Sequence, residues 1–436
     1  MNPTLQDCRD RDAEDPLRAL RALFALPAGK IYLDGNSLGA APKATAARIA
    51  DVVQREWSQD LIASWNQAGW VDLPQRLGDQ FAPWLGARAG ELVFTDTTSI
   101  NLFKVLTAAA RIAAEDGPAR RKLLTERSNF PTDLYIAQSV CAQHRLQLVL
   151  LDPEEIPRAF DDDAAIVLLT HVNYRTGAMH DMARLTAAAH AHRMVCVWDL
   201  SHSAGAVPVD LHAADADFAV GCGYKYLNGG PGAPAFVWAH PRVVNRCAQP
   251  LAGWFGHAAP FAFTPGYAPA AGIGRYLCGT PPILGLAALQ CGLDVFSAAA
   301  PLGGMAALRA KSLALTDLFI ALVEQRCAGH GLDLATPRAH EKRGSQVCFT
   351  RGEGQGVDGQ DSGAYAIVQA LIARGVIGDF RQGGGGPGAP PDILRFGFTP
   401  LYVGFEDVWN AVEQLRQVLA TGEWRDARFQ QRQAVT

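Results

Sequence analysis

The chain has 436 residues, of which 49% are apolar and 19% charged, and its formal net charge is −4 at pH 7. This amount of apolar material is enough to bury a large core, which excludes a chain that is disordered throughout. The 39 basic and 43 acidic side chains nearly balance, so nucleic-acid binding through a broad basic surface is excluded as well. Length alone favours two or three domains.

The nine cysteines are scattered and form no C-x-x-C pair. This spacing predicts free thiols, with neither a disulfide framework nor a metal site. The polar, acidic N-terminus differs from a secretory signal, and no window approaches the ~20 apolar residues that span a bilayer. We therefore expect a cytoplasmic protein that binds no membrane and no nucleic acid.

Between residues 91 and 240, short apolar runs alternate with helical stretches. The runs predict buried strands that begin near residues 91, 122, 146, 165, 195, 218 and 233. The stretches between them predict helices over 99–115, 131–144 and 182–193. This alternation predicts an α/β fold with a mostly parallel central sheet covered by helices. Ligands of such sheets bind beyond the carboxyl ends of the strands.

After residue 283 the pattern changes to that of a small α+β domain. A helical region reaches about residue 330, and it is followed by a strand at QVCFT, a helix near 363–374, a strand at ILRFGF and a helix near 405–420. The Gly/Pro-rich stretch 383–391 predicts a surface loop. We expect three parts: an N-terminal segment that packs with the small domain (1–40), a large domain (41–285) and the small domain (286–436).

A lysine follows the predicted strand at 218 in a glycine-rich setting. Lysine occurs only seven times in the chain, and small neighbours would let a bulky group approach Lys225 closely. One interpretation is an exposed loop lysine, with Asp199 at the neighbouring strand end acting as a helix N-cap. The other is a Schiff-base lysine, with Asp199 pairing with a pyridinium nitrogen.

Two strand-to-helix turns could complete such a site. Thr97, Thr98 and Ser99 lie where a predicted helix begins, and backbone amides at such a point bind phosphate, although an ordinary N-cap would use the same residues. Phe130 stands before Pro131 and could stack on a flat cofactor or form a hydrophobic staple.

Three further residues have two interpretations each. Trp254 and Thr280 lie in glycine-rich loops, and both are possible cofactor ligands. Alternatively, Trp254 is a core aromatic residue and Thr280 is a turn residue. Arg395 lies in an apolar strand and needs an acidic partner, which is either a substrate carboxylate or an internal Asp or Glu.

Together these segments resemble the kynureninases, which are pyridoxal-phosphate (PLP) hydrolases of the fold type I aspartate-aminotransferase superfamily. The resemblance covers nearly the whole chain and rests on nine motifs in order: YLDGNSLG, TDTTSINLFK, SNFPTD, HVNYRTG, WDLSHSAGA, GYKYLNGGPG, GWFGH, GTPPI and RFGFTPLY. It implies a large PLP-binding domain with a small α+β domain, and a Schiff base between PLP and Lys225.

The resemblance also implies the roles of other residues. Asp199 would pair with the pyridine nitrogen beside His202, and Tyr224 would assist Lys225 in proton transfer. The remaining cofactor ligands would be Thr98, Ser99, Phe130, Pro131, Thr132, Asp133, Thr170, Trp254 and Thr280. The substrate would contact Ser37, Trp65, Gly279, Thr280 and Arg395.

The implied reaction is hydrolysis of L-kynurenine, and of its 3-hydroxy derivative, to anthranilate or 3-hydroxyanthranilate and L-alanine in tryptophan catabolism. Trp254 and Thr280 usually reach the cofactor of the neighbouring subunit in this family, which implies a homodimer with shared active sites.

Three alternatives stay open at this point. A cysteine desulfurase would need a mobile cysteine near the cofactor, and an aminotransferase would share the Lys, Asp and Arg. A nucleotide-binding α/β protein would need a glycine-rich turn after the first strand, which is absent. A non-enzymatic scaffold would not need the pair of Lys225 and Asp199.

Overall fold

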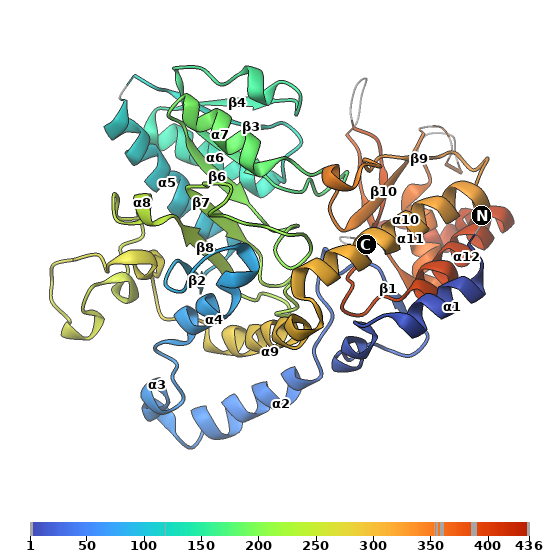
Figure 1. Cartoon of the computed structure of the whole chain (residues 1–436), viewed down its shortest axis with the longest axis horizontal. Helices are drawn as coiled ribbons and strands as arrows, with labels where there is room; N and C mark the ends of the chain where they lie inside the picture. The colour runs from blue at the N-terminus through green and yellow to red at the C-terminus, as the bar shows by residue number, and fades with distance from the viewer. Residues whose placement is uncertain are drawn as a thin grey trace. The chain divides into compact units, whose positions relative to one another are not determined.

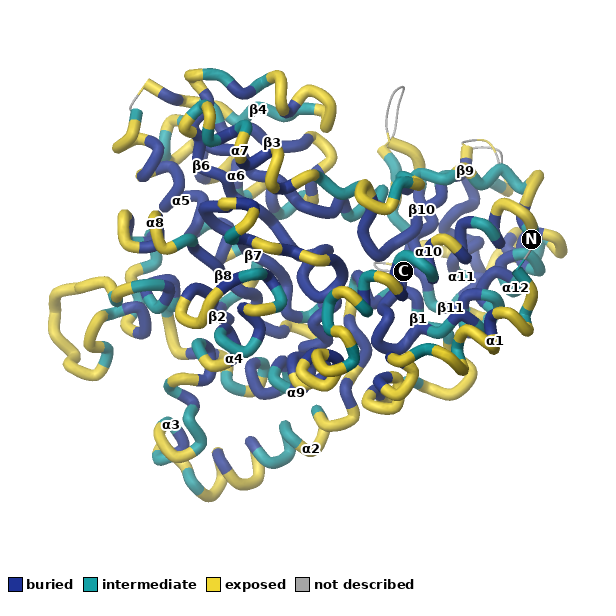
Figure 2. The backbone as a smooth tube through the Cα atoms, viewed as in Figure 1, coloured by how far each residue is buried: buried dark blue, intermediate teal, exposed yellow. Residues whose placement is uncertain are grey.

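The chain forms two compact units (Figure 1) in a computed structural model that describes residues 3–117, 119–352, 354, 356–357, 362–384 and 390–433. The larger unit comprises residues 43–174 and 180–294, and the smaller comprises 1–42, 175–179 and 295–436. In both units the strands of the central sheet are mostly buried (Figure 2). Part of the predicted loop at 383–391, residues 385–389, lies outside the described residues.

A seven-stranded sheet forms the centre of the larger unit, with the order β2-β8-β7-β6-β5-β3-β4. Of these strands only β8 runs against its neighbours, which confirms the predicted mostly parallel sheet. The predicted strands are all present, as β2 (Leu92–Thr95), β3 (Lys122–Glu126), β4 (Gln147–Leu151), β5 (Ala164–Thr170), β6 (Val195–Asp199), β7 (Phe218–Gly221) and β8 (Ala235–Ala239). Strands β5 to β8 are buried throughout, as expected of apolar runs that are covered on both faces.

Helices α5 (Thr98–Asp116), α6 (Pro131–His144) and α7 (Met182–Ala191) confirm the three predicted helices. Thr97 caps α5, because its side chain accepts a hydrogen bond from the amide of Ile100 at 3.3 Å. Pro131 takes the first position of α6, where its missing N–H costs nothing. The apolar side chains of α5 and α6 join those of the strands in one core. The unit's other α-helices are α2 (Ala44–Asp51), α3 (Ser64–Gln67), α4 (Leu73–Phe81), α8 (Pro241–Val244) and the part of α9 (Ile283–Ala299) up to residue 294.

The smaller unit holds a four-stranded antiparallel sheet, β12-β13-β10-β9, and a parallel pair, β1-β11. Strands β10 (Gln346–Arg351) and β13 (Ile393–Gly397) confirm the prediction, as do α10 (Gly304–Arg326), α11 (Ala364–Ala373) and α12 (Phe405–Thr421). Four strands of two or three residues were not predicted, since so short a run carries no periodicity: β1 (Ile31–Tyr32), β9 (Leu332–Leu334), β11 (Val376–Ile377) and β12 (Asp379–Arg381). Helix α1 (Leu5–Glu14) packs against α12.

The sequence was expected to contain no segment that is long and apolar enough to span a bilayer, and this expectation was wrong. Among the described residues one helical segment, Ile283–Leu302, is long and apolar enough, with a mean hydropathy of 1.6. Half of it is buried inside the protein, as in the core helix of a globular protein, so it is weak evidence for a membrane span.

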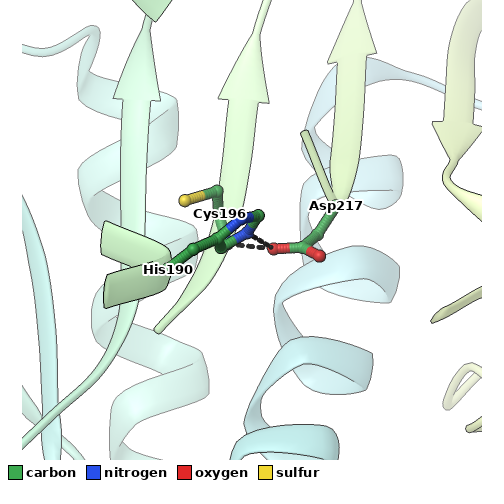
Figure 3. Close-up of side chains that lie close together, drawn as sticks. All are labelled: His190, Cys196 and Asp217. Carbon is green, nitrogen blue, oxygen red and sulfur yellow. Dashed lines mark hydrogen bonds and ion pairs between the residues drawn. The ribbon is translucent and has the colours of Figure 1, made fainter. Parts of the chain in front are cut away.

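A polar network stabilises the amino ends of β6 and β7 (Figure 3). The Asp217 carboxylate bonds with His190 Nε2 at 2.9 Å and accepts hydrogen bonds from the Cys196 amide at 2.8 Å and Arg242 Nη2 at 2.8 Å. His190, Cys196 and Asp217 lie close enough to hold a metal ion. However, Arg242 already occupies the carboxylate, and burial raises the pKa of the Cys196 thiol well above its usual value. The network is therefore interpreted as structural.

This network predicts a pH-dependent contribution to stability. The hydrogen bond to Asp217 raises the pKa of His190. The stabilisation by charged His190 is therefore complete below the ordinary histidine pKa of about 6.5. It is lost as the pH rises through the higher pKa that His190 has in the folded protein. We expect His190→Ala to lower the free energy of unfolding by about 1 kcal/mol near pH 6 and by less near pH 9 in urea titrations. Equal losses of unfolding free energy at both pH values would contradict this prediction. The control is His192→Ala, because the His192 ring is exposed and only loosely paired with Asp162.

Candidate functional site

A pocket of the larger unit lies beyond the carboxyl ends of β5, β6 and β7 and at the starts of α5 and α6. Within the described residues it is lined by Thr97, Thr98, Ser99, Phe130, Thr132, Asp133, Thr170, Tyr174, Asp199, Ser201, His202, Cys222, Tyr224 and Lys225. The parallel register of β6 and β7 pairs Asp199 with Val220, so the two strands end side by side. The structure thus brings together most of the predicted site residues of this unit.

Lys225 is buried, with 8% of its surface exposed, and its Nζ lies 3.1 Å from His202 Nε2. Lys104 and Lys311 are also buried, but each forms an ion pair with an aspartate. Lys225 forms no ion pair with a carboxylate in the described part of the chain. The interpretation of Lys225 as an exposed loop lysine is therefore wrong. A buried amine beside an imidazole is suited to act as a nucleophile and base.

Two of the glycines near Lys225 pack closely against backbone atoms. A Cβ on Gly223 would lie 2.1 Å from the carbonyl oxygen of Pro234, and one on Gly229 would lie 2.7 Å from that of Gly223. Gly230 has φ of +85°, which only glycine adopts without strain, and a Cβ there would meet open space. Gly223 and Gly229 thus allow the loop after β7 to pack tightly on itself.

Two buried carboxyl groups face Lys225. Asp199 Oδ1 accepts hydrogen bonds from the amide and hydroxyl of Ser201 at 2.8 and 2.6 Å, and no helix begins between β6 and β7, so Asp199 is not a helix N-cap. Asp133 Oδ2 accepts a hydrogen bond from Thr170 Oγ1 at 3.1 Å. Burial raises the pKa of both carboxyl groups, and the charge of Asp199 raises that of Asp133 further. The interactions of this pair therefore favour the proton on Asp133, while the hydrogen bonds from Ser201 favour the charged form of Asp199.

The start of α5 offers a site for an anion. Thr98 Oγ1 lies 3.2 Å from Cys222 Sγ, and Ser99 Oγ lies 3.5 Å from Thr132 Oγ1. The first amides of a 19-residue helix carry partial positive charge and have no partner within the helix. Hydroxyl groups and amides at this point match the oxygen atoms of a phosphate.

Phe130 contributes an aromatic ring to the same pocket. The ring is 39% exposed, and its centroid lies 5.6 Å from Lys225 Nζ. Its edge contacts Tyr174, with ring centroids 5.2 Å apart. One face of a flat ligand could therefore lie against Phe130.

Other predicted residues of the larger unit do not line this pocket. Trp65 packs against Trp70 and Phe255, and Pro131 begins α6. Trp254 is 38% exposed, and Gly279 and Thr280 are exposed as well.

The sequence did not single out three lining residues: Tyr174, Ser201 and Cys222. The position of Ser201, two residues after Asp199, was the signal that could have identified it. Cys222 bears on the desulfurase alternative, but it is 5% exposed and its Sγ donates a hydrogen bond to Ser201 Oγ at 3.2 Å. A thiol held in this way is not a mobile one.

Arg395 and Ser37 lie in the smaller unit, in a cluster of charged groups. Arg395 forms an ion pair with Asp379, and its Nη2 donates a hydrogen bond to Ser37 Oγ at 2.6 Å. Ser37 Oγ donates to Asp379 Oδ2 at 3.2 Å. The internal acid that the sequence allowed as a partner of Arg395 is therefore present.

Comparison with solved structures places the fold among known PLP enzymes. A cysteine desulfurase from Thermococcus onnurineus NA1 has a TM-score of 0.73 at 19% identity, covering 92% of this chain and 98% of its own. A cystine C–S lyase in complex with cysteine persulfide has a TM-score of 0.74 at 16% identity, covering 89% and 98%. At these identities the likeness concerns the fold alone, and it confirms the predicted fold class.

Sequence comparison separates the chain from these neighbours. Residues 308–415 match the model of the kynureninase C-terminal domain. A kynureninase from Pseudomonas fluorescens is 57% identical over 436 residues, which cover 99% of this chain and all of that protein. One from Burkholderia pseudomallei is 55% identical over 437 residues with the same coverage. The chain belongs to the kynureninase family of PLP-dependent hydrolases that act on carbon–carbon bonds.

Proposed function

We propose that this chain hydrolyses the Cβ–Cγ bond of L-kynurenine, and of 3-hydroxykynurenine, to release anthranilate or 3-hydroxyanthranilate and L-alanine. The observation that carries the proposal is the pocket in which Lys225, Asp199 and His202 meet the start of α5. Membership of the kynureninase family supports the choice of reaction.

The residues of the pocket fit PLP by their chemistry. Thr98, Ser99 and the first amides of α5 would hold the phosphate, and Phe130 would cover one face of the ring. Asp199 would keep the pyridine nitrogen protonated, since Ser201 and Lys225 favour its charged form. When bound, the cofactor supplies an electron sink for carbanions at the substrate.

Lys225 is the group in position to move protons. Its amine would take the α-proton of the substrate, and the burial of the pocket would keep competing water from that step. His202 lies in contact with Nζ and would orient it between the two carboxyl groups. Thr170 and Thr132 would hold Asp133 and Ser99 in place through their hydroxyl groups.

The substrate would be held by residues outside this pocket. Arg395 would bind the α-carboxylate, because a guanidinium matches a carboxylate with two parallel hydrogen bonds. Ser37, Trp65, Gly279 and Thr280 would contact the aryl group. Arg395 and Ser37 belong to the smaller unit. The proposed domains are a small domain made of 1–40 and 286–436 and a cofactor domain at 41–285.

We also propose a cytoplasmic homodimer. Trp254 is part of an exposed aromatic group with Phe261 and Phe263, which are 53% and 78% exposed. Exposed aromatic clusters are typical of protein interfaces. In a dimer, Trp254 and Thr280 would reach the cofactor of the neighbouring subunit, which explains why neither lines the pocket of its own chain.

One assay tests the function. The purified protein, supplied with PLP, is mixed with L-kynurenine, and anthranilate is detected by its fluorescence. We expect anthranilate and L-alanine in equal amounts, and a visible absorption band that borohydride removes. Formation of a keto acid without anthranilate would instead identify an aminotransferase, and no reaction would overturn the proposal.

Tyr224 offers a sharper test of the proton transfers. It lines the pocket next to Lys225, with Nζ 5.8 Å from its ring centroid. We expect Tyr224→Phe to keep the visible band of the bound cofactor but to lower kcat by about 100-fold, as the loss of a proton-relay group does. Stopped-flow absorbance and steady-state kinetics would measure both, and wild-type turnover would contradict the role.

A further inference from the structure

Arg395 is buried with an internal counterion. It lies in the middle of β13, is 1% exposed, and stands directly opposite Asp379 on β12. The Asp379 carboxylate pairs with the Arg395 guanidinium and also with Arg381 Nη2, at 2.7 Å. Arg395 is therefore not an open receptor for a carboxylate. A ligand must compete with Asp379 for the same guanidinium.

A second carboxyl group, Asp34, interacts with the same two arginines. Its Oδ1 is buried and has no hydrogen-bond partner among the described residues. Burial and then the charge of Asp379 raise the pKa of Asp34 to about 7, although Arg395, Ser37 and Arg381 act in the opposite direction. Asp34 is thus the group of this cluster that changes its proton occupancy near neutral pH.

The surrounding groups cannot replace Asp34 in this role. Burial raises the pKa of Tyr32, Tyr402 and Cys348, so all three stay neutral near pH 7. Arg175 lies outside this charge balance: it donates hydrogen bonds to two backbone carbonyl oxygens, and the charges that act most on Asp34 are those of Asp379, Arg395 and Arg381. In its charged form the cluster balances the carboxylates of Asp34 and Asp379 against the guanidinium groups of Arg381 and Arg395.

We propose that a ligand carboxylate binds Arg395 by displacing Asp379, and that the pair of Asp34 and Asp379 then takes up one proton from solvent. The inference rests on the proposed role of Arg395 as the ligand of the substrate carboxylate. A third carboxylate would leave one negative charge in excess in a buried cluster, which is strongly unfavourable. One proton on the Asp34–Asp379 pair restores neutrality. Both are positioning residues that act through Arg395.

The direction of the pH dependence follows from this linkage. Below about pH 7, Asp34 already carries a proton before the ligand arrives, so affinity does not change with pH. Above about pH 7 the proton must be taken from solvent, and the dissociation constant rises by up to about tenfold per pH unit. The pH dependence therefore appears in KM. It leaves kcat unchanged, because kcat describes substrate that is already bound.

The test compares the wild-type holoenzyme with Asp34→Asn, whose amide is neutral at every pH. KM and kcat for L-kynurenine are measured between about pH 6 and about pH 9. We expect the wild-type KM to rise with pH, and the KM of Asp34→Asn to stay flat and to lie below the wild-type value near pH 8.5. Asp333→Asn, an exposed carboxylate of β9, is the matched control and should keep the wild-type profile.

Arg395→Gln separates the two ways in which the test could fail. If Arg395→Gln leaves KM unchanged, Arg395 does not bind the carboxylate and its proposed role falls, together with this inference. If Arg395→Gln raises KM while Asp34→Asn keeps the wild-type pH dependence, the role of Arg395 stands and proton uptake is overturned.

Calorimetry gives a second measurement. L-Alanine is titrated into the wild-type holoenzyme and into Asp34→Asn in buffers of different ionisation enthalpy, so that the protons of the ligand itself cancel in the comparison. Near pH 8 we expect wild type to take up about one proton more than Asp34→Asn. Equal uptake by the two proteins would overturn the proposal.

Discussion

Replacing Lys225 with alanine is expected to lower kcat for L-kynurenine hydrolysis by about 10⁴-fold or more. The buried amine lies 3.1 Å from His202 Nε2 and forms no ion pair with a carboxylate among the described residues. Its removal takes away both the base for the α-proton and the nucleophile that attaches the cofactor. Anthranilate fluorescence measures the loss of turnover, and mass spectrometry after borohydride treatment should find no cofactor attached to the variant.

Two controls separate this effect from a general loss of structure. Lys43→Ala removes an exposed lysine of the same unit and should leave kcat unchanged. Lys104→Ala removes a buried lysine that binds Asp96 and the carbonyl oxygen of Tyr276. It should lower thermal stability by removing a buried ion pair. Turnover of Lys225→Ala within tenfold of wild type would contradict the assignment of Lys225.

The regular elements could be predicted because their sequence patterns are strong. Strand β5 is buried at every position, and its uninterrupted apolar run is typical of a central strand in a parallel sheet. The two-residue strands β1 and β11 could not be found, because their pairing joins segments more than 300 residues apart. Such pairing depends on the tertiary structure and leaves no local pattern.

The pocket itself was predicted in part. Asp199 and Lys225 were expected to meet because neighbouring parallel strands end at the same edge of a sheet, and β6 and β7 do so. The contact of Asp133 with Asp199 was not predicted, since it depends on where tertiary packing places the start of α6. The burial of Lys104 and Lys311 was also missed, because composition cannot show that a lysine has an internal carboxylate partner.

The second large effect is expected for Asp199→Asn. An asparagine can still accept the hydrogen bonds from Ser201, so the shape of the site is kept and only the negative charge is lost. We expect kcat to fall by about 10³-fold with the cofactor still bound, because a neutral amide cannot keep the pyridine nitrogen protonated. Steady-state kinetics together with the visible spectrum of the holoenzyme would measure both properties.

Asp133→Asn is the matched comparison for this variant. Asp133 contacts the same carboxylate, but burial and the charge of Asp199 raise its pKa well above the ordinary value, which favours a neutral form that an amide resembles. We expect its kcat to stay within about tenfold of wild type, since no charge is removed from the pocket. If Asp133→Asn were the more damaging variant, the charge would reside on Asp133, and the partner of the pyridine nitrogen would have to be assigned to Asp133 instead.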